Sequence, residues 1–495
     1  MNAYVSAAQL ERDGEAPRSL THRLSLGLVW LAIASGAVVF TEPAPIDALL
    51  MGLVVLLPTV GLVAFRRELI GYLACWLLIV VAAVVASGAA VDVARASTHT
   101  FVTLYLVLAS FILAGFVARR PVAHSRLILN AYLVSTILAS LAAIVGFFAL
   151  VPGAQEAMTR FGRAAGTFKD PNVLGPFLVL GLLYAMHLAL ERTLLRALWP
   201  LATAALLAFA LILTFSRGAW ANLVVAGLAY GYLSFLTARS NWYRVRLMLV
   251  GMVGLIGSVL VVGVALQFDA VTALLSDRAA LVHGYDVGPE GRFGGQEKAL
   301  ELILQHPFGL GALEFANGHH HEDVHNVYLN MFLNAGWLGG LLYIGLIATT
   351  LAIGFRSILR VSPARPLLIL AYSAFLGHAA EGVLVDTDHW RHVFVILSLV
   401  WGLVAVAGRQ AAQWSPRRDE PILDPVLVLP PSRRMARVLA PAPLQLAAPA
   451  RRAARALVPL LPSRRSPRIL RPILAAPEPR RRLPRTLRPL LIGEH

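Results

Sequence analysis

Cysteine is almost absent from this chain of 495 residues, which contains a single one, Cys75, inside an apolar run. One cysteine excludes an intrachain disulfide framework and a thiolate metal cluster. Charged residues are also scarce, at 14% of the sequence against 58% hydrophobic residues. This balance is atypical of soluble domains and typical of proteins that cross a membrane several times.

Long apolar runs take the place of the missing charge. The first ~20 residues are polar and of mixed charge, so no cleavable signal peptide is visible. After them, runs long enough to cross a hydrocarbon core of ~30 Å recur along the chain. We therefore predict an all-α polytopic membrane protein with about twelve transmembrane helices. The expected spans are 24–40, 47–64, 69–87, 98–117, 127–150, 173–190, 197–214, 218–237, 247–267, 326–354, 367–385 and 393–408.

The distribution of positive charge predicts the orientation of these spans. With a cytoplasmic N-terminus, the inner segments before residue 409 carry 16 Lys and Arg and the outer segments carry nine. Such an excess marks the cytoplasmic side, so both termini are expected there. The predicted organisation is a cytoplasmic segment at 1–23, a membrane domain at 24–408 and a tail at 409–495. One long outward-facing loop, 268–325, separates spans nine and ten.

The tail differs from the rest of the chain in composition. From residue 415 it holds 17 Arg, no Lys and five acids among Pro, Ala and Leu, with PSRR at 431–434 and again at 462–465. Proline at this density disfavours long helices and predicts a disordered cytoplasmic extension. Two roles stay open: binding anionic lipid headgroups, at roughly 1 kcal/mol per basic residue, or a topology anchor without chemistry. Because residues 415–495 supply +12 of the net +16, the high pI is no evidence for nucleic-acid binding by the core.

Unusual polar residues gather on the predicted outer face. They lie in four segments: residues 151–172, TFSRGAW at 214–220, the long loop, and DTDHWRH at 386–392. Arg217 stands at the end of an apolar hairpin, where an arginine is costly unless it snorkels to water or has a partner. It is either an interfacial arginine or a guanidinium that binds a phosphate in a bidentate manner.

The long loop contains GRFGGQEKALELILQHPFGLGALEF at 291–315. We predict a short amphipathic helix at about 296–305 that lies on the membrane or caps a cavity. Arg292, just before it, is a second candidate for anion binding. The predicted apolar stripe consists of Ala299, Leu300, Ile303 and Leu304.

Residues 319–325, HHHEDVH, resemble a metal site in composition alone. Adjacent histidines point in diverging directions, and no H-x-x-x-H pair on a helix fixes a ligand geometry, so no metal is predicted. The run is more typical of a solvated loop tip or a pH-sensitive patch. His325 differs because it stands with Asn326 at the start of a span. There it is either a general base for a hydroxyl at the membrane surface or a helix cap.

Four motifs in this order resemble the O-antigen ligase/polymerase superfamily. They are RAAGTFKDPNVLGPFL (163–178), TFSRGAW, the helix after Arg292 with its HPFGLGALEF end, and HNVYLNMFLNAGWLGG (325–340). The resemblance covers about residues 160–400 and leaves the tail outside. It implies a GT-C-like membrane glycosyltransferase that needs no nucleotide sugar, metal or other cofactor.

The resemblance also implies substrates and a place in the cell. The donor is a glycan on undecaprenyl diphosphate at the periplasmic face of the bacterial inner membrane. The acceptor is lipid A–core in a ligase, or a growing O-antigen or exopolysaccharide chain in a polymerase. We favour the ligase, because the H-N…G-W-L-G-G segment fits that family. A polysaccharide transporter without chemistry is an alternative of another class, although no inverted repeat supports it.

Residue roles follow from the same motifs. Arg217 and Arg292 would bind the diphosphate leaving group, and His325 would be the base for the acceptor hydroxyl. These roles fit the chemistry, because charge develops on the phosphate as the hydroxyl loses its proton. Residues that we expect to add to the site without an assigned role are Lys169, Asp170, Asn172, Asn326, Asp388, His389 and Arg391, with His320 and His321 as alternative bases.

Overall fold

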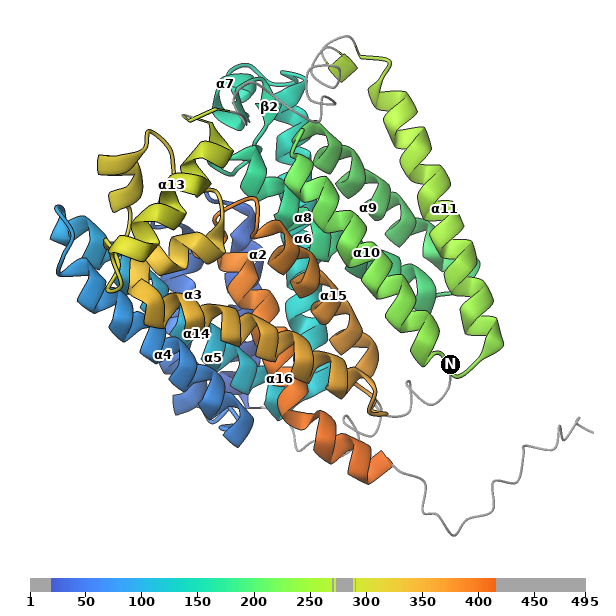
Figure 1. Cartoon of the computed structure of the whole chain (residues 1–495). Helices are drawn as coiled ribbons and strands as arrows, with labels where there is room; N and C mark the ends of the chain where they lie inside the picture. The colour runs from blue at the N-terminus through green and yellow to red at the C-terminus, as the bar shows by residue number, and fades with distance from the viewer. Residues whose placement is uncertain (1–18, 269–270, 273–287, 290, 415–495) are drawn as a thin grey trace, which may run out of the picture. The chain divides into compact units, whose positions relative to one another are not determined.

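The part of the chain that the structure describes is almost entirely helical (Figure 1). The computed structural model describes residues 19–268, 271–272, 288–289 and 291–414. The β structure within those residues is one antiparallel hairpin, β1 (Thr159–Arg160) and β2 (Arg163–Ala164). In chain order the helices are α2 (Leu20–Ala34), η1 (Ser35–Ala37), α3 (Pro45–Thr59), α4 (Arg67–Ser87), α5 (Val93–Arg119), α6 (Pro121–Phe147), α7 (Ala154–Met158), α8 (Pro171–Glu191), α9 (Leu194–Leu213), α10 (Arg217–Thr237), α11 (Asn241–Ala265), α13 (Arg292–Gln305), η2 (Phe315–His319), α14 (Val327–Ile358), α15 (Arg365–Glu381) and α16 (Arg391–Trp414).

The helices confirm an all-α polytopic membrane protein. Each of the twelve expected spans overlaps an α-helix. Nine of the described helices are long and apolar enough to cross a membrane. The other three, α2, α3 and α15, have 15, 15 and 17 residues, which is short for a hydrocarbon core of ~30 Å. The count of twelve transmembrane helices therefore stays a prediction.

Polar caps define where three helices of the predicted outer face begin. The side chains of Asp170, Ser216 and Asn326 each accept a hydrogen bond from a backbone N–H in the first turn of α8, α10 and α14. Such caps satisfy donors that have no partner inside the helix. Asn326, and not its neighbour His325, is thus the cap of α14.

Helix burial separates a packed centre from a margin. α16 packs along α5. Of the apolar stretch that could cross the membrane, 89% is buried in α16 and 72% in α5. Ser110 on α5 joins α4 to α16, since its hydroxyl meets Tyr72 Oη at 2.8 Å and donates to the Phe394 carbonyl at 3.0 Å. α11 lies at the edge beside α9 and α10 (Figure 1), and none of its apolar stretch is buried. Its apolar surface is therefore available to lipid.

A kink in α14 creates the surface on which α13 rests. Gly336 has φ +65° and ψ −172°, a backbone conformation that favours glycine. The turn after α13 fits against this kink: Leu310 N donates to Leu333 O at 2.7 Å, and Trp337 N to Pro307 O at 2.9 Å. A side chain at Gly309, whose φ is +85°, would lie 2.7 Å from the Gly336 nitrogen. The glycines of the two motifs therefore allow close backbone contact.

Three sequence predictions need correction. The loop helix begins at Arg292, four residues before the expected start. Its buried face consists of Ala299, Leu302 and Ile303, whereas the expected Leu300 and Leu304 are 52% and 73% exposed. The observed spacing of three and four residues places one face toward α14. α16 also runs to Trp414, beyond the expected end at 408. The expected N-terminal segment up to residue 18 and the tail from 415 lie outside the described residues.

Candidate functional site

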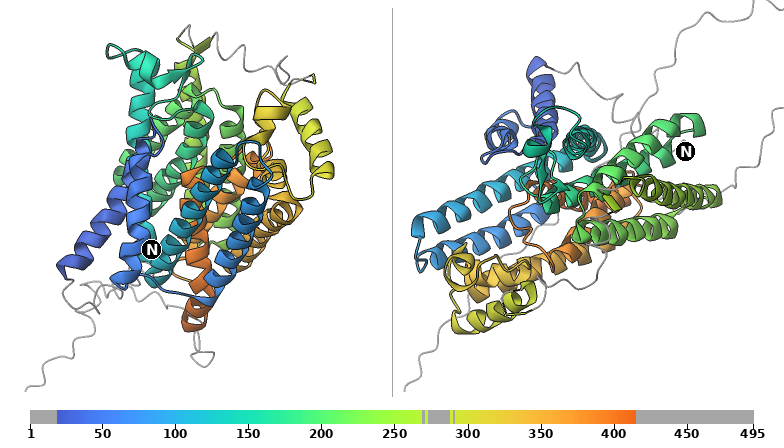
Figure 2. Two further views of the ribbon diagram at one scale, coloured as in Figure 1. Left: turned by 90° about the vertical axis from the view of Figure 1, so that its left-hand side faces the viewer. Right: turned by 90° about the horizontal axis from the view of Figure 1, so that it is seen from above.

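Polar segments that are distant in sequence meet at one end of the bundle. The α7–β hairpin and α13 both lie at this end in Figures 1 and 2. Lys169 in the 151–172 segment pairs with Glu42 at 3.0 Å, and Arg95 on α5 donates to Asn317 Oδ1 at 2.9 Å. The structure therefore brings the four predicted outer-face segments to the same end of the bundle.

Arg163 links the first two of these segments. Its buried guanidinium donates through Nε to Thr214 O and through Nη2 to Asn172 Oδ1, both at 2.7 Å. Asp170 accepts from Asn172 N at 2.7 Å and caps α8. The DPN turn and the TFSRG hairpin thus share one hydrogen-bonded frame. Of the expected site residues, Asp170 and Asn172 are part of this frame.

Arg217 is the first residue of α10 and is partly buried. The chain reaches it through Phe215 at φ +48° and the cap Ser216. A side chain at Gly218 would lie 2.9 Å from Glu381 Oε1 at the end of α15. The start of α10 therefore packs directly on a buried carboxyl group.

The same end of α15 supports the start of α14. The Gly382 carbonyl accepts from Val327 N at 2.8 Å, two residues after His325. Glu381 is 2% exposed and accepts from Asn222 Nδ2 at 2.7 Å through Oε2. Arg217 and His325 therefore stand on helix starts that pack against the two adjacent residues Glu381 and Gly382. An acid inside an apolar span was the sequence signal for Glu381.

The backbone of His325 is held by Asp386. His325 has φ +52°, an uncommon conformation for a residue other than glycine. The two oxygens of Asp386 accept from His325 N at 2.9 Å and from Asn326 N at 3.1 Å. One carboxyl group of the DTDHWRH segment thus stabilises the turn that presents the histidine.

The His325 side chain has a carboxylate partner and a nearby cation. Nε2 lies 3.3 Å from Glu322 Oε2, and the side chain is 30% exposed. Burial and then the charge of Arg292 lower the pKa of His325, so the imidazole is neutral at pH 7. If Nε2–H donates to Glu322, the lone pair stays on Nδ1 and the ring is a base. Gln296 of α13 also donates to the His325 carbonyl at 3.4 Å, so the first turns of α13 lie against His325.

His320 and His321, the alternative bases, have different surroundings. His320 is buried and its Nδ1 lies 3.2 Å from Glu322 N. A side chain on Gly295 would lie 3.3 Å from its ring, so His320 packs against α13. The His321 side chain is 54% exposed and lies 3.9 Å from Glu322. Of the three, His325 combines partial exposure with Arg292 close by.

Asp386 belongs to a group of acids whose charges repel. Burial, then the charges of Asp388 and Asp323, raise the pKa of Asp386 to about 8. The unfolded chain has an ordinary Asp pKa of ~3.9, so the folded state binds this proton more tightly. The resulting stabilisation is complete below pH ~4 and is lost as the pH rises through about 8.

Asp386→Asn is therefore expected to flatten the pH dependence of stability. As the pH is raised from 5 to 9, the melting temperature of the wild type should fall more than that of the variant. Only the wild type has this carboxyl group to ionise. Thermal unfolding of the two purified proteins at several pH values measures the difference. Glu297→Gln, at an exposed position on α13, is the control. Parallel curves for wild type and Asp386→Asn would contradict the assignment.

Lys169 and Arg391 are both paired with acids. Arg391 donates to Asp47 through Nε at 2.6 Å and Nη2 at 2.8 Å, and its Nη1 lies 3.4 Å from Glu42. Lys169 pairs with the same Glu42. These contacts tie α16 and the DPN segment to α3. Both cations are bound to protein carboxylates.

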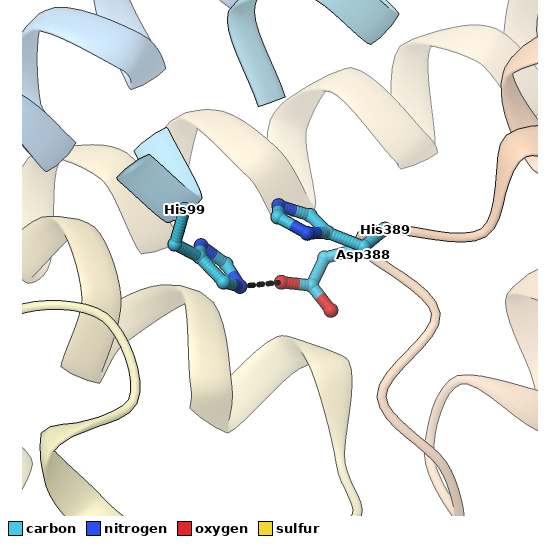
Figure 3. A group of neighbouring side chains, drawn as sticks. All are labelled: His99, Asp388 and His389. Carbon is cyan, nitrogen blue, oxygen red and sulfur yellow. Dashed lines mark ion pairs between the residues drawn. The ribbon is translucent and has the colours of Figure 1, made fainter. Parts of the chain in front are cut away.

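Asp388 and His389 meet His99 of α5 (Figure 3). One ligand atom from each residue lies within 4.8 Å of the others, a spacing that suits a metal site. The two imidazoles stack with centroids 3.7 Å apart, however, and His389 Nε2 lies 2.8 Å from Thr103 Oγ1. The lone pairs of stacked rings lie in two nearly parallel planes, an arrangement that does not favour their meeting at one ion. Burial and then His99 lower the pKa of His389 to about 4, so it is neutral.

The comparisons with known proteins bear on this geometry. The model of a family described as O-antigen ligase matches residues 202–344, a segment that contains Arg217, Arg292 and His325. This segment of the chain is therefore similar to the O-antigen ligase family. It matches no curated protein.

The match covers less than a third of the chain, which also has nine described helices long and apolar enough to cross a membrane. The O-antigen ligase match ends before the DTDHWRH segment and begins after the DPN turn. Only the tertiary structure connects these two segments to His325 and Arg217. Glu322, Arg163, Glu381 and Asp386 are polar residues of this O-antigen ligase-like site that the sequence analysis did not select.

Proposed function

We propose that the protein is a membrane glycosyltransferase that moves a glycan from undecaprenyl diphosphate to an acceptor hydroxyl. The reaction takes place at the periplasmic face of the bacterial inner membrane, in a GT-C-like bundle with both termini in the cytoplasm. The favoured acceptor is lipid A–core, which makes the enzyme an O-antigen ligase. The observation that carries the proposal is that the segment similar to the O-antigen ligase family contains Arg217, Arg292 and His325, each at or beside the start of a helix.

The reaction can be written with the residues of the site. The acceptor hydroxyl gives its proton to His325 Nδ1, and its oxygen attacks the anomeric carbon of the donor sugar. The bond from that carbon to the diphosphate oxygen breaks, and undecaprenyl diphosphate leaves with the electron pair. Arg292 and Arg217 stabilise the charge that develops on the phosphate. Glu322 stabilises the imidazolium and is thus a positioning residue for His325.

Deletion of the gene, complemented with wild type or His325→Ala, tests the function. We expect loss of long-chain lipopolysaccharide on gels, with full-length glycan retained on undecaprenyl diphosphate, and rescue by wild type only. Single repeat units on the carrier would identify a polymerase of O-antigen or exopolysaccharide. Unchanged glycans in every strain would refute glycan transfer.

Chelators are expected to leave transfer unchanged. The reaction as written uses arginines where other enzymes use a metal ion, and the rings of His99 and His389 are stacked face to face. Activity of purified enzyme after EDTA treatment, with and without added Mg²⁺ or Zn²⁺, measures this. Inhibition that a divalent cation reverses would contradict the metal-independent reaction and point to His99, Asp388 and His389.

A further inference from the structure

A cavity of about 280 Å³ lies next to the site. Its walls come from α2, α3, α6, α8 and the segment that leads into α16. These elements lie outside the O-antigen ligase match. Drug-sized ligands occupy pockets of roughly 300–1,000 Å³, so this cavity suits a ligand of about one sugar ring.

Aromatic rings form much of the wall. Phe177 lies with its centroid 4.9 Å from that of Phe168 and 5.0 Å from that of Tyr132. The Tyr132 hydroxyl donates to Phe177 O at 2.8 Å, so its polar atom is already satisfied. Trp390 completes the set. Aromatic faces carry negative charge density and attract the polarised C–H groups on the flat face of a pyranose.

A buried imidazole also lines the cavity. His392 is 5% exposed, and its Nε2 has no hydrogen-bond partner among the described residues. An unsatisfied buried polar atom destabilises the fold, and a ligand that bonds to it would recover that free energy. An imidazole nitrogen either donates or accepts, according to tautomer, and so suits a hydroxyl group.

The charges at the cavity are balanced. Of the cations that line the cavity, Lys169 pairs with Glu42, and Arg391 pairs with Glu42 and with Asp47 behind the wall. The other acid of the lining, Asp386, is protonated at pH 7 because burial and the charges of two neighbouring aspartates raise its pKa to about 8. Such a set gives no net attraction for a phosphate or a carboxylate. It does offer donors and acceptors together, as a neutral ligand rich in hydroxyl groups requires.

Asp386 connects the cavity to the histidine. It lines the cavity, and its two oxygens accept from the backbone of His325 and Asn326. A ligand in the cavity is therefore separated from the His325 turn by one side chain.

We propose that this cavity is a subsite for a neutral pyranose of the acceptor glycan, which it holds beside His325. The inference rests on the proposed glycosyl transfer and adds where the acceptor sugar binds. An acceptor ring held by the aromatic wall and His392 would keep its reacting hydroxyl near the base at low entropic cost.

Filling the cavity tests the subsite in the transfer reaction. Val173 lines it from the first turn of α8, so Val173→Phe should raise the KM for the acceptor at least tenfold and leave the KM for the donor unchanged. Leu188→Phe is the matched control on the same helix, about four turns away and outside the cavity lining. An unchanged acceptor KM in folded Val173→Phe would overturn the proposal.

Direct binding separates this proposal from the proposed function. The intrinsic fluorescence of the full chain in nanodiscs, which comes from nine Trp including Trp390, is titrated with the methyl glycosides of glucose, galactose, mannose and N-acetylglucosamine. We expect a saturable change with at least one of them, retained in His325→Ala and lost in Val173→Phe and Trp390→Phe.

Each result has a distinct meaning. Sugar binding without transfer by wild type would refute the transferase and leave the sugar site standing. No response to any of the four glycosides would overturn the subsite. Competition by the isoprenoid alcohol farnesol in place of sugar would also overturn it, because the cavity would then hold a lipid chain.

Discussion

Replacing His325 with alanine is expected to lower the rate of transfer by about 10²- to 10⁴-fold, the usual contribution of a general base. The imidazole is neutral because burial and Arg292 lower its pKa, so the wild type presents a base at pH 7. Binding of the lipid-linked donor should persist, since the arginines hold the diphosphate. Turnover and donor affinity of the purified variant are measured separately.

Another histidine of the same loop serves as the control for His325→Ala. His319→Ala removes a histidine of the same loop, at the end of η2, and should retain activity. His320→Ala and His321→Ala examine the alternative bases in the same assay. Full turnover by His325→Ala, or loss of donor binding in it, would show that the histidine is not the base.

Replacing Arg217 or Arg292 with alanine is expected to lower transfer by about 10²- to 10³-fold, as loss of one donor to a developing oxyanion does. Arg292 begins α13 beside His325, and Arg217 begins α10 against the end of α15. Each guanidinium would contact phosphate oxygens in the transition state. Lysine at either position should rescue only in part, because it lacks the planar pair of donors.

The matched control is Arg160→Ala on β1. Arg160 lies at the same end of the bundle, and its guanidinium donates to the nearby carbonyls of Glu156 and Thr159. It should retain transfer at normal abundance in the membrane. If Arg217→Ala and Arg292→Ala also retained transfer, the diphosphate assignment would be wrong.

The helices were accessible from the sequence because membrane thickness imposes a length on each apolar run. All twelve expected spans coincide with helices, although three of these are shorter than 18 residues. Arg292 was placed near a helix start, but the buried face of that helix was predicted with Leu300 and Leu304, which are exposed. Which face of a short helix is buried depends on the partner, here the kinked α14.

The sequence by itself determined the class of the protein and the motifs around Arg217, Arg292 and His325. These are local properties, since apolar run length and motif order need no knowledge of distant contacts. Only the tertiary structure decided that Asp386 supports His325 from 61 residues away and that Arg163 joins the DPN turn to Thr214. A hydrogen bond between distant residues leaves no periodic pattern in a single sequence, because it depends on how the helices pack.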